Sequence, residues 1–309
     1  MPVNTLIVIL GPTAVGKTET TLCLADFFHS PIINADSRQI FQEIPIGTAA
    51  PTMEQQLRAK HYFVGNHHID EYYSASLFEE DVLNLLQTIW KTNSVAIMSG
   101  GSMMYIDAVC NGIDDIPTVD DQTRMLMKRR LEEEGLPKLV EELKTLDFDH
   151  WQHVDKNNPR RVLHALEICH MTGKPYSSFL TNKVKKRPFR IIKIGLNLPR
   201  DVLYARINSR VVEMIEHGMI DEAKRVLPYK HCNALNTVGY KELFEYFEGA
   251  LSLDEAIAKI QSNTRRYARK QLTWYKRDAS VTWFEPSQNK QIIQHILNEM
   301  QTNTAKARV

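Results

Sequence analysis

The sequence has little excess charge of either sign, few cysteines and no long apolar run. Its 309 residues carry 38 Lys and Arg against 37 Asp and Glu, so any surface for a polyanion must be local. The cysteines are Cys23, Cys110, Cys169 and Cys232. They form no C-x-x-C pair, which indicates small buried side chains in a reducing compartment. No apolar run approaches the ~20 residues of a membrane span and no leader-like segment opens the chain, so we expect a cytoplasmic protein.

What is present is typical of a globular protein of about two domains. Hydrophobic residues make up 43% of the chain and charged residues 24%. Three histidines, His61, His67 and His68, lie in a loop-rich stretch. Metal ligation is one interpretation of them, but no second ligand pair at helical or hairpin spacing accompanies them. We therefore expect them to pack or to form hydrogen bonds.

The strongest signal lies between residues 6 and 28. Five apolar residues, 6–10, predict a buried strand, residues 11–18 (GPTAVGKT) match G-x-x-x-x-G-K-[ST], and residues 19–28 continue as a helix. Inward-facing N–H groups and the helix N-terminus then form a phosphate cradle. Lys17 would contact the phosphates, and Thr18 would offer its hydroxyl to Mg²⁺. The predicted phosphate-binding residues are Gly11, Pro12, Thr13, Ala14, Val15, Gly16, Lys17 and Thr18.

Two further strands are predicted to end near this loop. One, residues 31–36, ends in Asp36, and another, residues 95–98, is followed by Ser-Gly-Gly-Ser at 99–102. Open α/β sheets bind ligands at the carboxyl edge of their strands. Phosphoryl transfer usually adds a second carboxylate for Mg²⁺; it is absent after Met98, although Asp36 could fill that role. The loop alone leaves ATP hydrolysis, phosphoryl transfer and binding of another diphosphate open.

The alternation of strands and helices is interrupted from about residue 113. A linker at 114–117 leads into a charge-dense helical region, in which Asn158-Pro159 starts a helix that Gly173 ends. A strand returns at 191–196. We expect an α/β fold: a P-loop core with a mostly parallel sheet flanked by helices, plus an inserted all-helical subdomain. The expected boundaries are 1–116 and 187–285 for the core, 117–186 for the insertion, and 286–309 for a C-terminal short helix and tail.

Three other helices carry the remaining signals. Ser76 with Glu79 predicts the start of one helix, and Ser252 with Glu255 the start of a long one through Arg277. The second half of the long helix, 264–277, holds six cations and three aromatic residues, which favours RNA binding over arginine stems that merely cover the core. Arg206 and Arg210 share a face of the helix 201–217. Two interpretations of this pair are open: the arginines contact a ligand, or they lie on a solvated helix face with Glu213 as an ion-pair partner.

Six segments together resemble the tRNA dimethylallyltransferases. They are residues 11–18, 36–39, 99–102 with Tyr105, 158–161 leading to 165–167, 238–242, and 264–274. The resemblance runs in order from about residue 5 to residue 278. It implies a core related to nucleotide kinases, with a helical insertion that helps to grip the anticodon stem-loop. It also implies transfer of a dimethylallyl group from dimethylallyl diphosphate to N6 of the tRNA adenine just 3′ of the anticodon (position 37), which yields N6-isopentenyladenosine and diphosphate.

The resemblance assigns roles to individual residues. The cradle, Lys17 and Mg²⁺ held through Thr18 would neutralise the departing diphosphate, with Arg210 as an additional cation. Asp36 would act as the general base for the weakly nucleophilic amine, and Ser102 would orient the base. The predicted tRNA contacts are Asp36, Ser37, Arg38, Gln39, Ser102, Arg124, Arg160, Arg161, Arg265, Arg266 and Arg269. Nothing in the sequence demands more than a monomer.

The chain departs from the family pattern at three positions. Met103 stands where a glycine is usual and would narrow the prenyl pocket; Phe41 replaces a tyrosine, and His164 replaces an arginine. Two other functions use some of the same features. A small-molecule kinase would use the loop for ATP, but lacks the carboxylate after Met98. A non-enzymatic RNA-binding protein would use only the basic helix and leave the loop unexplained.

Overall fold

The computed structural model describes residues 3–181 and 183–306 of the chain. It divides into two compact units. The first comprises the chain up to Asn111 together with the chain from Arg187 onward, and the second is Gly112–Lys186. The first unit carries the sheet and the predicted phosphate loop, and the second is helical.

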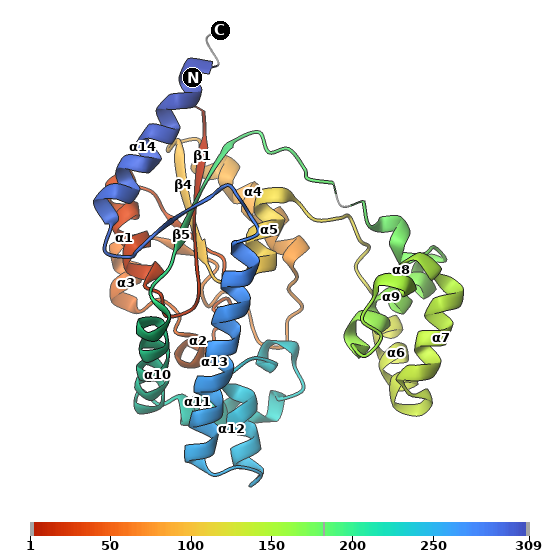
Figure 1. Ribbon diagram of the computed structural model, residues 1–309. Helices are drawn as coiled ribbons and strands as arrows, with labels where there is room; N and C mark the ends of the chain where they lie inside the picture. The colour runs from red at the N-terminus through yellow and green to blue at the C-terminus, as the bar shows by residue number, and fades with distance from the viewer. Residues whose placement is uncertain (1–2, 182, 307–309) are drawn as a thin grey trace. The chain divides into compact units, whose positions relative to one another are not determined.

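A six-stranded sheet in which every pairing is parallel forms the centre of the first unit (Figure 1). The strand order is β3-β2-β4-β1-β5-β6. The strands are β1 (Thr5–Leu10), β2 (Ile32–Asn34), β3 (His61–Tyr62), β4 (Val95–Gly100), β5 (Arg190–Leu196) and β6 (Val281–Phe284). The predicted α/β class with a parallel sheet flanked by helices is confirmed. Because the strands are parallel, β1, β2 and β4 end at the same edge.

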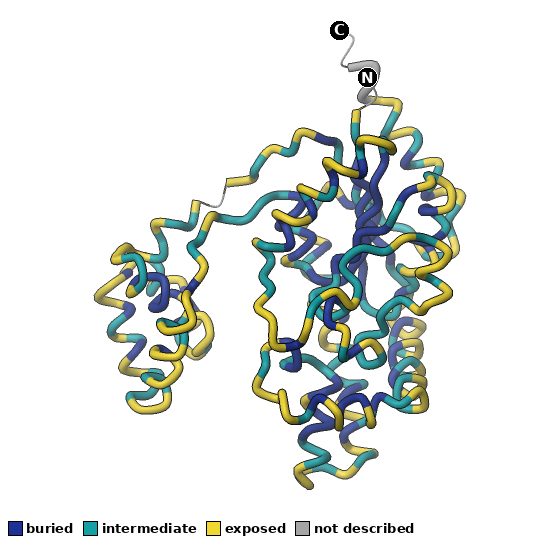
Figure 2. The backbone as a smooth tube through the Cα atoms, turned by 180° about the vertical axis from the view of Figure 1, so that it is seen from behind, coloured by how far each residue is buried: buried dark blue, intermediate teal, exposed yellow. Residues whose placement is uncertain are grey.

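Side chains of β1 alternate between two hydrophobic cores, one on each face of the sheet. Leu6 and Val8 pack with α4 (Ala75–Ile89) and α5 (Met103–Asn111). Ile7 and Ile9 pack on the opposite face, where α1 (Lys17–Phe28), α10 (Arg200–Glu216) and α14 (Asn289–Lys306) contribute their apolar residues. Burial on both faces explains the unbroken apolar run. Figure 2 shows the central strands in the colour of buried residues.

A third cluster lies beyond the carboxyl edge of the sheet. It joins the loop that carries α2 (Pro45–Thr48) to α11 (Met219–Val226), α12 (Tyr240–Phe247) and α13 (Leu253–Tyr275). Its one fully buried carboxylate, Glu222, accepts hydrogen bonds from the N–H groups of Ile46 and Gly47, each at 2.8 Å, and from the Tyr240 hydroxyl. This buried acceptor fixes the start of α2. The remaining short helices of the first unit are α3 (Met53–Arg58), η2 (Leu227–Tyr229) and η3 (Asn233–Leu235).

The second unit has a small core of its own. Its helices are α6 (Asp121–Glu134), α7 (Leu136–Leu146), α8 (Phe148–His153), α9 (Pro159–Thr172) and η1 (Tyr176–Phe179). Met127, Leu139 and Leu166 are fully buried there. The predicted ends of α9 are confirmed: the Asn158 side chain accepts a hydrogen bond from Arg161 N at 3.3 Å, and Gly173 is left-handed with φ 67°.

Three predicted helix boundaries are wrong. The helix predicted to start at Ser76 begins at Ala75, because the Ser74 side chain accepts the hydrogen bond from Leu77 N at 3.2 Å. Helix α13 ends at Tyr275 rather than at Arg277. The C-terminal helix α14 extends to Lys306 and is not short, because Ile292 and Ile296 anchor it in the core.

The histidines of the 61–68 stretch bond to nearby groups of the protein. His61 Nδ1 contacts Ala59 O, His67 Nδ1 contacts Glu71, and His68 Nδ1 contacts Glu43, each at 2.7 Å. Within the described ranges, no three His, Cys, Asp or Glu side chains gather into a metal-holding group. All four cysteines are free thiols. In the part of the chain that the structure describes, no helix has the length and apolarity to cross a bilayer.

A buried ion pair lies where the chain returns to the core. The guanidinium of Arg187 donates to Glu79 Oε1 at 2.6 Å, to Ala108 O at 2.7 Å and to Val109 O at 2.9 Å. The Arg187 and Glu79 side chains are only 8% and 9% exposed. The last turn of α5 is thereby joined to α4 and to the chain just before β5.

Replacing Arg187 by Met should lower the free energy of unfolding by about 3–5 kcal/mol, because Glu79 would stay buried after losing the guanidinium charge that faces it. Urea unfolding followed by circular dichroism measures the change. The double variant Arg187→Met/Glu79→Leu should recover most of the loss, since it removes both buried charges. A single variant that unfolds at the same urea concentration as the parent would show that the pair contributes nothing.

Candidate active site

The loop between β1 and α1 takes its shape from three residues with positive φ. A Cβ on Gly11 would lie 2.6 Å from Leu196 O, so only glycine permits this approach to β5. Gly16, with φ 109°, precedes the first turn of α1, and Ala14 is left-handed with φ 62°. The predicted strand, glycine loop and helix are therefore present in order. Their arrangement directs the N-terminus of α1 toward the sheet edge, where an anion is favoured.

Lys17 lies folded over this loop. Its Nζ donates to Gly11 O at 3.0 Å and to Pro12 O at 2.8 Å. The pKa of Lys17 is lowered to about 8, mainly by burial and also by the nearby charge of Arg210, while Asp36 acts in the opposite direction. An ammonium group has three donors, so one N–H remains for a ligand.

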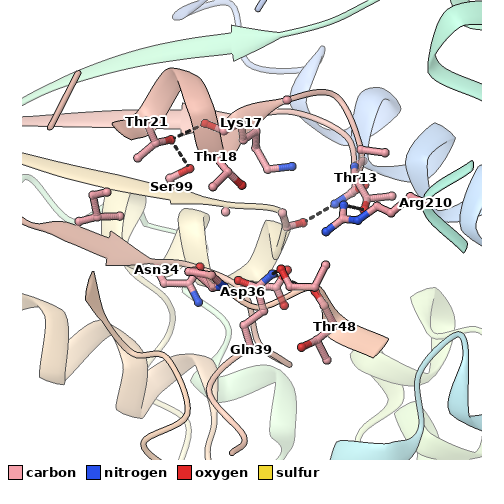
Figure 3. A pocket seen from close by; sticks show the side chains of 18 of the residues that line it. Thr13, Lys17, Thr18, Thr21, Asn34, Asp36, Gln39, Thr48, Ser99 and Arg210 are labelled. Carbon is pink, nitrogen blue, oxygen red and sulfur yellow. Dashed lines mark hydrogen bonds between the residues drawn. The ribbon is translucent and has the colours of Figure 1, made fainter. Parts of the chain in front are cut away.

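Two adjoining cavities open beside the loop. The first, which we name the loop cavity, has a volume of about 330 Å³ and contains Lys17, Thr18, Asp36 and Gln39 in its lining. The second, which we name the helix cavity, has about 420 Å³ and extends between α10 and α13. Both are lined by Thr13, Ala14, Asp36, Thr48, Arg210 and Tyr267. Figure 3 shows Lys17 and Thr18 on one side of the loop cavity and Asp36 and Thr48 on the other.

Asp36 lies just after β2, beside the turn that follows β4. Its Oδ1 accepts a hydrogen bond from Arg38 N at 3.0 Å. Ser102 Oγ accepts from Ser37 N at 2.7 Å and donates to Ser37 Oγ at 3.0 Å. A Cβ on Gly100 would lie only 2.1 Å from Ala35 O, so the two segments touch through their main chains. The structure thus brings together residues that the sequence placed at one sheet edge.

Two arginines of α10 reach the phosphate loop. Arg210 Nη1 donates to Thr13 Oγ1 at 3.3 Å, and Arg206 Nη1 donates to Val15 O at 3.0 Å. Burial lowers the pKa of Arg210, while the carboxylates of Asp36 and Glu213 raise it. Both arginines contact the loop, so they do not form a purely solvated face with Glu213, and contact with a ligand stays a prediction.

Two N–H groups of the loop are already bonded within the protein. Thr13 N donates to Gln271 Oε1 at 2.9 Å, and Val15 N donates to Pro12 O at 3.4 Å. Two of the loop N–H groups are therefore occupied within the protein, by the short turn at 12–15 and by the approach of α13.

Several residues of the site were not predicted. Thr21 Oγ1 donates to Ser99 Oγ at 2.8 Å, so a hydroxyl pair occupies the position where the missing carboxylate would lie. Gln271 and Tyr267 reach the site from α13, four residues apart on one helix face. That spacing could have indicated a shared position beside the site, but the neighbouring cations in the sequence favoured the interpretation as an RNA-binding face. Thr48 is the last residue of the four-residue helix α2, which is too short to show a periodic pattern in the sequence.

The predicted tRNA-contact residues fall into different places. Gln39 Nε2 donates to the carbonyls of Thr48 and Ala49 at 2.9 and 3.0 Å, and so supports the cavity wall. Arg265 and Arg266 donate to Asn208 and Asn263, and Arg269 lines a separate groove. Among the described residues, neither cavity's lining includes these three arginines. Arg124, Arg160 and Arg161 belong to the second unit, on α6 and α9.

Met103 is the first residue of α5 and packs against the core that α5 shares with α4. Within the described ranges it is absent from the lining of both cavities, and its effect on the prenyl pocket stays a prediction. His164 lies 3.5 Å from Glu167 and packs its ring edge-on against Tyr176. Phe41 is buried in the third cluster.

Comparisons with known proteins agree on one family. The family model described as IPP transferase matches residues 39–278, which is more than half of the chain. The chain is 56% identical over 297 residues to tRNA dimethylallyltransferase 2 of Parabacteroides distasonis, which covers 96% of this chain and 99% of that protein. The tRNA isopentenylpyrophosphate transferase structure from Bacillus halodurans is 32% identical, with a TM-score of 0.72, over 99% of this chain and 100% of that one. A eukaryotic dimethylallyltransferase structure, 24% identical, has the same fold with a TM-score of 0.81, over 97% of this chain and 80% of that one.

The affinity of the site for inorganic diphosphate should fall as the pH rises above about 8, because Lys17 loses its proton there. By pH 9 about a tenth of Lys17 stays charged, so the weakening attributable to Lys17 is up to about tenfold. Isothermal titration calorimetry with diphosphate and Mg²⁺ measures it. The diphosphate itself also titrates, so Lys17→Met serves as the control and should lack this component. Parallel pH profiles for the parent and Lys17→Met would contradict the assignment.

Proposed function

Because this chain belongs to the tRNA dimethylallyltransferase family, we propose that it transfers a dimethylallyl group from dimethylallyl diphosphate to N6 of the tRNA adenine 3′-adjacent to the anticodon. The products are N6-isopentenyladenosine in tRNA and diphosphate. The observation that carries this proposal is that the phosphate loop and Asp36 line the same cavity. A leaving diphosphate and an accepting carboxylate can therefore act on one substrate pair.

The leaving group is the first chemical problem that the site solves. The carbon–oxygen bond of an allylic diphosphate breaks readily once the charge on the departing diphosphate is neutralised. Lys17, Arg210 and the N-terminus of α1 supply that neutralisation from three sides of residues 11–18. The diphosphate leaves whole, so no carboxylate is needed at Ser99 to position a transferring phosphoryl group.

The nucleophile is the second problem. The lone pair of an adenine N6 is delocalised into the ring, so a base must remove a proton as the new N–C bond forms. Asp36 lies at the boundary of the loop and helix cavities, and the proton passes to its carboxylate. The adenine must leave its stack to reach the site. Ser37, Arg38 and Ser102 line the helix cavity with Asp36 and would orient the extruded base.

A magnesium ion fits the donor set of the loop cavity. Mg²⁺ keeps several water ligands and is bound by one or two protein oxygens together with substrate phosphates, so it needs no cluster of carboxylates. The Thr18 hydroxyl lies in the cavity lining beside Lys17, and it would hold the ion against the diphosphate. When bound, the ion supplies additional neutralisation of the leaving group.

The tRNA substrate would need a larger contact surface than the two cavities provide. We propose that residues 117–186 grip the anticodon stem-loop, with Arg160 and Arg161 exposed on α9 as phosphate contacts. Arg124 of α6 and Arg265, Arg266 and Arg269 of α13 are the other proposed contacts. We further propose that the chain acts as a monomer in the cytoplasm.

Purified protein with Mg²⁺, labelled dimethylallyl diphosphate and unmodified tRNA should place label in RNA, and nucleoside mass analysis should find N6-isopentenyladenosine. The tRNA must carry adenine 3′ of the anticodon, and the same tRNA with guanine there is the control. A chain that instead consumes ATP with a small metabolite, and leaves every such tRNA unlabelled, would contradict the proposal.

Asp36→Asn should lower the single-turnover rate of transfer by about 10²–10⁴-fold, because the amide cannot accept the proton. Binding of tRNA, measured by filter binding, should change by less than about threefold. Asp26→Asn removes an exposed carboxylate of α1 that pairs with Arg58, and it should keep the parent rate. Full turnover by Asp36→Asn would remove Asp36 from the base role.

A further inference from the structure

The buried side-chain amide of Gln271 connects the phosphate loop to the turn that follows β4. Gln271 of α13 is 1% exposed. Its Oε1 accepts a hydrogen bond from Thr13 N at 2.9 Å, and its Nε2 donates to Gly101 O at 2.8 Å. The two partners fix the orientation of the amide, because a main-chain N–H can only donate and a carbonyl can only accept. A side-chain amide presents a neutral donor and a neutral acceptor on separate atoms, and glutamine has a longer reach than asparagine.

One end of this link belongs to the diphosphate cradle. Thr13 is the third residue of the loop, and its hydroxyl accepts the hydrogen bond from Arg210 at 3.3 Å. The N–H that Gln271 holds is one that a phosphate would otherwise attract. Gln271 therefore sets the position of Thr13 without contributing a ligand to the anion.

The other end belongs to the segment that positions the base. Gly101 precedes Ser102, whose Oγ accepts from Ser37 N, the residue directly after Asp36. A Cβ on Gly101 would lie 2.5 Å from Gln271 Nε2 and 3.9 Å from Asp36 Oδ2, which shows how closely the amide and the carboxylate flank this turn. Tyr267 OH also donates to Gly101 O, at 3.4 Å.

We propose that Gln271 is a positioning residue that fixes the separation between the leaving-group cradle and the Asp36 carboxylate. The inference rests on the function proposed above. Transfer needs the allylic carbon between the departing oxygen and the attacking N6, and a displacement of about 1 Å can reduce the rate about 10²-fold. Loss of the amide removes the bond that ties Thr13 N, at a part-buried position, to the turn at 101–102, so the loop can shift relative to that turn.

The test uses two variants of nearly the same size, Gln271→Glu and Gln271→Met. At pH 8 the carboxylate of the first repels Gly101 O, and the thioether of the second donates nothing. We expect the single-turnover rate of prenyl transfer to fall at least 30-fold in both. The KM for tRNA and the affinity for Mg²⁺-diphosphate should stay within about threefold of the parent. Gln261→Glu, which places the same charge elsewhere on α13, is the matched control and should keep the parent rate.

The pH profile separates positioning from a merely structural role. A protonated Glu at position 271 has one donor and one acceptor, as the amide does. The single-turnover rate of Gln271→Glu relative to the parent should therefore rise when the same preparation is brought from pH 8 to pH 6. The charged and polar groups that face the same site are Asp36, Lys17, Arg210 and Tyr267. They are present in both proteins, so each rate is expressed relative to the parent at the same pH.

Each outcome decides the matter. A loss that is confined to KM, a rate within twofold of the parent in Gln271→Met, or a Gln271→Glu rate ratio that is flat with pH would overturn the assignment. If Gln271→Met does not fold, the test uses Gln271→Glu alone. Its rate of prenyl transfer should then recover reversibly as the pH is lowered, while the variant stays folded. A parent without prenyl transfer would instead remove the proposed function, and the positioning role with it.

Discussion

Direct contact between main chains at the carboxyl edge of the sheet is the constraint on which the rest of this structure depends. Gly100 approaches Ala35 and Gly11 approaches Leu196 so closely that no Cβ fits at either glycine. These approaches bring the ends of β1, β2 and β4 within reach of one small molecule. The polar groups at the strand ends themselves, Asp36, Ser99 and Ser102, are then carried on short side chains, which lose little conformational entropy on assembly.

A phosphate loop can serve either a phosphoryl group that moves or a diphosphate that departs. In this enzyme the neighbouring strand β4 carries Ser99 one residue before its end, and Ser99 pairs with Thr21 and offers no carboxylate. A carboxylate lies one strand further out, at Asp36, and it lines both the loop cavity and the helix cavity. Under the proposed function, this position would let the carboxylate serve the acceptor amine of an alkyl transfer while the loop holds the diphosphate.

Sequence predicted those parts of the fold and site that depend on local pattern. The loop at 11–18, the ends of α9 and the shared edge of Asp36 and Ser102 all follow from periodicity, capping residues and the parallel sheet. The rest depends on contacts between distant residues. Gln271 reaches Thr13 across a separation of 258 residues, and the cations beside it in sequence suggested only RNA binding. The cap at Ser74 was missed because two serines lie two residues apart and only packing of α4 selects between them.

The guanidinium of Arg187 has a consequence for how the helical insertion is attached. It holds the end of α5, through Ala108 and Val109, against the residue at which the core resumes. Nearby, Asp114 accepts from Thr181, and Lys185 pairs with Asp115. The insertion therefore closes a loop whose two ends are already adjacent, and closure entropy grows only slowly with loop length. Insertions of quite different length could therefore connect these two points with only a small change in the free energy of unfolding. The stability of the sheet and of the site at its edge would then depend little on the size of the insertion.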